Sequence, residues 1–91
     1  MSYKVVVHQK AVKELQKLPF AAKRQVEKAV DKLADNPRPP GYEKLEGFKS
    51  ERVPNTQCYR IRIGDLRAIY TIEDDIITVT VVQVKKRGDI Y

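Results

Sequence analysis

The sequence predicts an α+β domain in which a helical hairpin packs on one face of a mainly antiparallel sheet. Three observations indicate this fold. A β-branched stretch opens the chain, two segments with helical spacing of apolar residues follow it, and the last third is rich in strand-like runs separated by tight turns. The predicted order is β-α-α-β-β-β, in a single domain that covers residues 1–91.

The first half of the chain supplies one strand and both helices. Residues 3–8 (YKVVVH) are β-branched, as is typical of a strand. Pro19 ends the first helix or starts the second. Asn36 precedes Pro37, which stops the second helix. The apolar residues that define the helices are Ala11, Val12, Leu15 and Leu18 in the first, and Ala22, Val26, Ala29, Val30 and Leu33 in the second.

A proline- and glycine-rich loop over residues 36–50 separates the helices from the remaining strands. Within it, residues 44–47 are expected to form a short turn or strand that brings Leu45 to the core. Residues 59–63 and 66–72 are predicted to form a hairpin around the Gly64-Asp65 turn. After a second, acidic turn at residues 73–75, residues 76–84 form an almost unbroken β-branched run, which indicates a strand covered on both sides.

Strand alternation predicts a basic face on this hairpin. Successive side chains of a strand point to opposite faces, so Arg60 and Arg62 share the face that the helices do not cover. Arg67 of the next strand falls on the same face. The helix-facing set is then Tyr59, Ile61, Ile63, Leu66, Ala68, Tyr70 and Ile72.

The last strand is expected to add further cations to this face. Counting back from Arg87 by twos places Lys85, Gln83, Val81 and Val79 with the arginines. A solvated sheet face is one interpretation, but such a face normally mixes both charge signs, and these strand positions hold arginine with no carboxylate between them. The alternative interpretation is a face that recognises phosphate, because the guanidinium group of arginine donates paired hydrogen bonds and stays charged.

Composition narrows the class of protein. The formal net charge of +6 favours an anionic partner such as nucleic acid. Cys58 is the only cysteine, so a disulfide framework and a cysteine metal cluster are excluded, and a cytoplasmic location is expected. No apolar run is long enough for a membrane span. His8, the only histidine, and the acidic turn are expected to be structural or solvated, and no metal or other cofactor is expected.

Three segments resemble the RelE/ParE toxin superfamily, and its RelE branch in particular. They are residues 44–47 (KLEG), residues 59–70 (YRIRIGDLRAIY) and residues 84–91 (VKKRGDIY). The family pattern is a basic-apolar-basic strand, a Gly-Asp turn, a strand that runs from Arg to Tyr, and a terminal Arg shortly before a Tyr. The matched pieces occur in the right order and span nearly the whole chain.

The resemblance implies the toxin of a toxin–antitoxin system that cleaves mRNA in the ribosomal decoding site. In that reaction, which needs no metal, the ribose 2′-hydroxyl attacks the adjacent phosphate and translation is inhibited. Cations lower the barrier by stabilising the negative charge that gathers on the phosphoryl oxygens. The implied partners are a cognate antitoxin and the ribosome with its mRNA, including contacts to 16S rRNA.

The resemblance also assigns roles to residues. Arg60 and Arg62 would hold phosphates, although arginine is a poor proton acceptor. Arg67 would contact the scissile phosphate, Arg87 would stabilise the leaving oxygen or the transition state, and Tyr91 would stack on a base or take part in proton transfer. Many relatives carry histidine at the position of Lys86. Lys44, Lys85 and Lys86 are expected to bind RNA.

Two other functions share the same fold. ParE-type relatives poison DNA gyrase, and a degenerate relative would bind RNA without cleaving it. Fold alone does not separate these functions. The arginine set with Tyr91 favours the endoribonuclease, because a gyrase inhibitor has no need of it.

Overall fold

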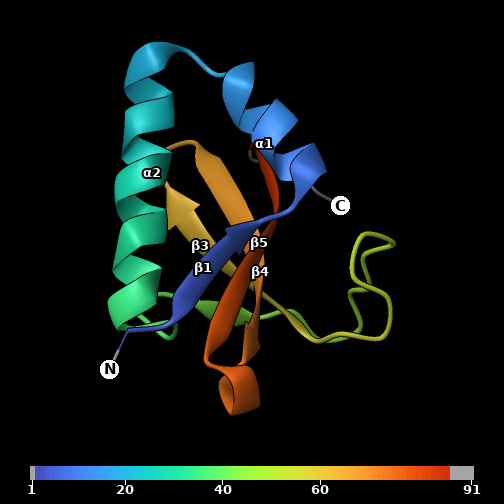
Figure 1. Cartoon of the computed structure of the whole chain (residues 1–91). Coiled ribbons are helices and arrows are strands. Elements are labelled where there is room, and N and C mark those ends of the chain that lie inside the picture. Colours follow the sequence, from blue (N-terminus) through green and yellow to red (C-terminus); the bar gives the residue numbers. More distant parts are fainter. Residues whose placement is uncertain (1, 87–91) are drawn as a thin grey trace.

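The computed structural model describes residues 2–86 and has two helices on one side of a five-stranded sheet (Figure 1). This is the α+β class that the sequence predicts. The elements are β1 (Lys4–Val7), α1 (Gln9–Gln16), α2 (Phe20–Asp35), β2 (Glu43–Lys44), β3 (Cys58–Ile63), β4 (Leu66–Glu73), the 3₁₀ turn η1 (Asp74–Ile76) and β5 (Thr78–Lys86).

The sheet has the strand order β1-β5-β4-β3-β2. β1 runs parallel to β5, and the other neighbours are antiparallel. The first and last strands of the described chain are therefore paired, and the helices carry the chain from β1 at one edge of the sheet to β2 at the other. The two-residue β2 is the short strand expected near residues 44–47, and it forms the edge next to β3.

The helix-facing side of the sheet is the main core, and it has the composition that strand alternation predicts. Val26, Val30 and Leu33 of α2 meet the apolar faces of β3, β4 and β5. Tyr70 is fully buried there, and its hydroxyl donates to the Pro37 carbonyl at 2.7 Å. The β3 and β4 residues of this core are Ile61, Ile63, Leu66, Ala68 and Tyr70, with Tyr59 and Ile72 packed against it.

The opposite side of the sheet is partly covered as well. The segment 45–57 forms a loop on the side away from α2 (Figure 1), and its Phe48 and Val53 pack against a small second core. That second core consists of Cys58, Ile69 and Val82 together with Leu45. β5 is thus covered on both sides, as its β-branched run predicts, and the basic face remains open only at one end.

The prediction that Val79 and Val81 share the arginine face is wrong. Both are fully buried in the helix-facing core. The register of β4 and β5 shifts between Ile69 and Tyr70, which pair with Gln83 and Val81. Val82 is therefore an extra residue, a β-bulge, and counting by twos fails across it.

The last strand also starts later than predicted. Residues 74–76 form η1, and Ile77 follows it with a φ of 49°, in the left-handed region. The 3₁₀ turn uses the residues expected to begin the strand, so β5 starts at Thr78 and extends to Lys86. Within residues 2–86, no helix has the length and apolarity needed to cross a membrane.

The β3–β4 hairpin depends on Gly64. Ile63 pairs with Leu66, which leaves Gly64 and Asp65 as the two turn residues. Gly64 has a φ of 59°, whereas Asp65 is not among the residues with positive φ. A positive φ at the first turn residue alone is the pattern of a type II′ turn, which favours glycine there. This turn sets the register of every β3–β4 pair.

We predict that Gly64→Ala lowers the free energy of unfolding by about 1–2 kcal/mol, because an L-residue is strained at this φ. Urea denaturation followed by circular dichroism measures the change. Asp65→Ala is the control, with an expected change of less than about 0.5 kcal/mol for an exposed turn residue. Equal effects of the two substitutions would contradict this account of the turn.

Candidate functional site

Three cations form a row across the sheet on the side away from the helices. Arg62 of β3 lies directly opposite Arg67 of β4, and Arg67 lies opposite Lys85 of β5. Arg62 is exposed, and the other two are half-buried. The structure thus brings together three of the residues that the sequence predicts for the site. Like charges placed opposite each other destabilise a sheet, so the facing pair of Arg62 and Arg67 is costly unless an anion binds to it. Lys85 is partly compensated, because its Nζ lies 4.0 Å from Oε2 of Glu14.

Arg60 lies on the same face but in a different environment. Its side chain is only 5% exposed, and it forms an ion pair with Glu43. The pairing of β2 with β3 explains this contact, because Glu43 is the register partner of Arg60. The face as a whole therefore carries a carboxylate, although the strand positions between the arginines hold none, as the sequence indicates. Strand alternation could not reveal Glu43, because this residue comes from the proline-rich loop segment.

A groove of about 660 Å³ connects these side chains. Its floor carries the three arginines, and one wall is the start of the segment 45–57. The lining residues are Glu43, Lys44, Leu45, Glu46, Gly47, Phe48, Arg60, Arg62 and Arg67.

Two buried arginine nitrogens in the groove lack a hydrogen-bond partner among the described residues. They are Nη1 of Arg60 and Nε of Arg67. Buried polar groups are nearly always satisfied in folded proteins, and guanidinium nitrogens can only donate. Two unsatisfied donors in one basic groove therefore indicate a site for an acceptor-rich anion, and phosphate oxygens match the guanidinium geometry.

The lysines predicted to bind RNA have different positions. Lys44 is exposed at the rim of the groove, with its Nζ atom 3.5 Å from Glu46 Oε1. Lys85 belongs to the cation row. Lys86 is exposed but pairs with Leu66, so its register is that of the helix-facing side. Arg87 and Tyr91 lie outside the described residues.

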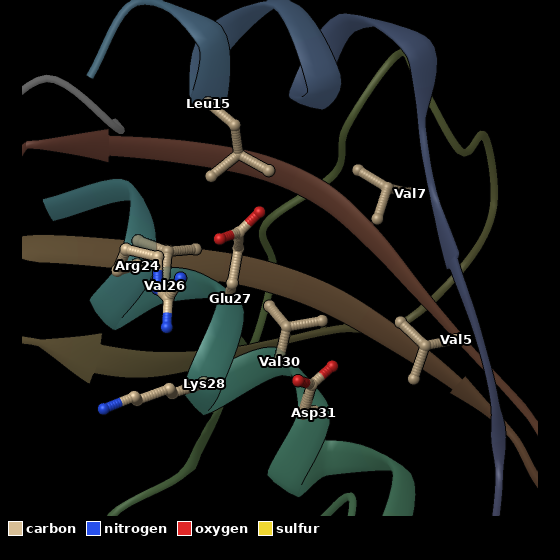
Figure 2. Close-up of a pocket in the computed structure, with 9 residues that line it drawn as sticks. All are labelled: Val5, Val7, Leu15, Arg24, Val26, Glu27, Lys28, Val30 and Asp31. Carbon is tan, nitrogen blue, oxygen red and sulfur yellow. The ribbon is translucent and has the colours of Figure 1, made fainter. Parts of the chain in front are cut away.

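A second hollow has a different character. It has a volume of about 470 Å³ and lies between α2, α1 and β1. Figure 2 shows valines of β1 and α2 facing each other across it, with charged side chains of α2 nearby. Its walls are Val5, Val7, Leu15, Val26 and Val30, with Arg24, Glu27, Lys28 and Asp31 beside them. It contains no unsatisfied buried donor among the described residues, so the basic groove is the better candidate for chemistry.

Neither His8 nor the acidic turn adds a reactive group to the groove. His8 caps α1, where its Nδ1 accepts a hydrogen bond from the Lys10 amide at 3.1 Å. Asp74 of the turn binds Arg38, which lowers the pKa of its carboxyl. Cys58 is fully buried, and this burial raises the pKa of its thiol. Among residues 2–86, no group of three or more histidine, cysteine or acidic side chains is arranged to hold a metal ion.

A family model described as "ParE toxin of type II toxin-antitoxin system, parDE" matches residues 5–91. The chain belongs to this toxin family. A "putative RelE-like toxin protein" of Escherichia coli is 36% identical over all of this chain and 92% of its own length. The toxin family is therefore shown by sequence, and this relative is of the RelE type.

Solved structures agree with this assignment. A chain of the archaeal RelE–RelB complex from Pyrococcus horikoshii OT3 is 34% identical, with a TM-score of 0.80, and the match covers 98% of this chain and 99% of that one. A chain of the intact E. coli RelBE toxin–antitoxin complex is 26% identical, with a TM-score of 0.75 and coverage of 96% and 99%. The two helices on a mixed sheet are thus the fold of RelE structures.

We predict that pyrophosphate stabilises the protein through the groove. A ligand present at 100 times its Kd adds about 2.7 kcal/mol to the free energy of unfolding. The rise in Tm measures this effect. Arg62→Gln and Arg67→Gln should each reduce it strongly, whereas Arg24→Gln, an exposed α2 residue outside the groove, should leave it unchanged. Undiminished stabilisation of both groove variants would place the anion elsewhere.

Proposed function

We propose that this toxin is a ribosome-dependent endoribonuclease that cleaves mRNA in the decoding site and so inhibits translation. The observation that carries the proposal is the groove with its unsatisfied guanidinium donors. Arg62, Arg67 and the buried Arg60 are arranged around one cavity, where donors fixed in advance stabilise a phosphoryl group as it gains charge. The RelE-like relatives support this activity over others of the fold.

The reaction proposed for the groove is attack by the ribose 2′-oxygen on the adjacent phosphorus. The bond from phosphorus to the 5′-oxygen of the next nucleotide breaks, leaving a cyclic phosphate, and the 5′-oxygen takes a proton from Tyr91 or from water to become a hydroxyl. Arg67 and Arg62 bind the phosphoryl oxygens, and Lys44, Lys85 and Lys86 contribute charge along the RNA. Arg87 is assigned to the leaving oxygen or the transition state, and Tyr91 to base stacking or proton transfer. No metal or cofactor enters these steps.

Glu43 supplies the proton acceptor that the arginines cannot. Its carboxylate lines the groove and is 59% exposed, so it is accessible to a ribose hydroxyl. A carboxylate accepts protons, whereas arginine stays protonated. When Glu43 takes the proton, its charge is neutralised, and its attraction for the Arg60 guanidinium becomes weaker. The Arg60 guanidinium is then available to the phosphate at the moment when negative charge develops there.

The partners proposed for this cytoplasmic toxin are a cognate antitoxin and the programmed ribosome. The P. horikoshii relative was solved as a RelE–RelB complex, and the E. coli relative as a RelBE toxin–antitoxin complex. A groove that binds phosphates also suits 16S rRNA. The second candidate function is inhibition of DNA gyrase, which the ParE description of the family model favours.

Primer extension on mRNA bound to programmed ribosomes tests the proposed function. We expect defined cuts with the wild-type protein and a rate about 100- to 1,000-fold lower for Arg67→Gln, because a donor to the transition state is lost. Arg24→Gln is the surface-charge control and should cleave normally. No cleavage by the wild-type protein, with inhibition of gyrase supercoiling, would establish the second candidate instead.

The role of Glu43 is tested by separating cleavage from binding. We predict that Glu43→Gln lowers the single-turnover cleavage rate by about 100- to 10,000-fold, the usual contribution of a general base. RNA affinity should stay the same or increase, because a negative charge leaves the groove. Glu46→Gln, which removes another carboxylate of the same groove, is the matched control. A normal rate in the Glu43 variant would exclude it as the proton acceptor.

A further inference from the structure

The C-terminal half of β5 extends beyond the strand that pairs with its outer edge. β1 pairs with Thr78–Val81 of β5. Within residues 2–86, the last backbone hydrogen bond at this outer edge is the His8 amide donating to the Val81 carbonyl at 2.8 Å. Beyond that point, side chains bond to the backbone of β5. Nη1 of Arg52 donates to the Val82 carbonyl at 2.8 Å, and the Val84 amide donates to Oε1 of Glu14 at 3.1 Å.

Glu14 and Arg52 also bind each other. Nη1 and Nη2 of Arg52 donate to Oε1 and Oε2 of Glu14, each at 2.9 Å. The two side chains are only 16% and 18% exposed. Burial of the Glu14 carboxyl would raise its pKa, but the hydrogen bonds from Arg52 and Val84 outweigh that effect and the pKa is lowered. The two side chains thus form a charged pair with two mutual hydrogen bonds and two more to the backbone of β5. We call this pair, Glu14 and Arg52, the edge clamp.

The edge clamp joins three parts of the molecule. Glu14 belongs to α1, on the helix side of the sheet, whereas Arg52 belongs to the segment that covers the other side. The buried Ser50 holds Arg52 in place, because its side-chain oxygen accepts from the Arg52 amide at 3.2 Å. The clamp therefore closes around the open edge of β5 and fixes it to both covering layers.

The edge clamp holds two parts of the molecule that belong to the groove or its cation row: the segment that carries Arg52 and the C-terminal end of β5. The segment that carries Arg52 begins with Leu45–Phe48, which forms a wall of the groove. Val84 precedes Lys85, the third cation of the row, whose Nζ lies 4.0 Å from Oε2 of Glu14. Arg52 itself does not line the groove, and its guanidinium is occupied by Glu14 and Val82.

We propose that Glu14 and Arg52 are positioning residues for the groove, holding its wall and the Lys85 end of β5 in place without contacting the RNA. This inference rests on the endoribonuclease function proposed above. Small displacements of groups that bind a transition state reduce rates strongly, while binding through several distributed phosphate contacts is less sensitive. Loss of the clamp should therefore reduce the rate of cleavage more than the affinity for RNA.

The test compares Glu14→Gln and Arg52→Lys with a matched control, Arg38→Gln. The control breaks another two-bond Arg–carboxylate pair, between Arg38 and Asp74, whose residues do not line the groove. Two readouts are measured for each protein. Amide hydrogen exchange at Val84 and over residues 45–53 reports the clamp, and single-turnover cleavage with ribosome-bound mRNA gives rate and Kd separately.

We expect faster exchange at Val84 in both clamp variants and cleavage about 10- to 100-fold slower, with Kd within about twofold of wild type. Arg38→Gln should change neither readout. Faster exchange with wild-type cleavage would overturn the positioning role and leave the proposed function intact. A Kd weakened in proportion to the loss of rate would also overturn it, because Arg52 would then bind RNA directly. Unchanged exchange would show that the clamp does not hold β5.

The results differ if the proposed endoribonuclease function itself is wrong. If the wild-type protein does not cleave mRNA, the exchange experiment still reports whether the clamp holds β5, and the positioning role in cleavage is rejected with the function. If the wild-type protein cleaves and Arg67→Gln is inactive, the groove is the active site, and only the clamp variants decide the present inference.

Discussion

The register between β3 and β4 is the constraint on which the rest of the molecule depends. Apolar and basic residues alternate along β3, and a slip of one residue would bury arginines in the helix-facing core and expose that core's apolar side chains. The Gly64 turn and the burial of Ile61, Ile63 and Tyr70 select the same register. The position of Arg62 opposite Arg67 is a direct result of it. The pairing of β3 with β4 thus determines both the basic binding surface on one face of the sheet and the apolar core on the other.

The site side of the sheet is built at a cost to stability. Arg62 and Arg67 face each other with equal charge, and two buried guanidinium nitrogens have no hydrogen-bond partner within residues 2–86. Each feature opposes folding, and neither contributes to the core. Natural sequences keep such local conflicts mainly at functional sites. Glu43 reduces the conflict at Arg60 while remaining accessible in the groove, so one carboxylate serves both stability and the proposed chemistry.

The segment between β2 and β3 has a larger role than its irregular sequence suggests. It supplies a wall of the groove, covers Cys58, Ile69 and Val82, and provides Arg52 to the edge clamp. The path of this one loop therefore decides which part of the basic face is covered and which part stays open. Leu45 and Phe48 cover one part of this face, where apolar side chains form the second core. Beside that part, the arginines line the groove. The shape of the groove depends on how this loop is anchored.

Sequence alone determined the fold class, the order of both helices and the longer strands, the helix-facing residues of β3 and β4, and the basic face with Arg60, Arg62 and Arg67. These follow from periodicities of 2.0 and 3.6 residues, which are local properties of the chain. Local patterns did not determine the ion pair of Glu43 with Arg60, the bulge at Val82 or the edge clamp. Each of these depends on contacts between residues distant in sequence, such as Glu14 with Val84. Only the packing of the sheet, helices and loop decides which of those residues meet.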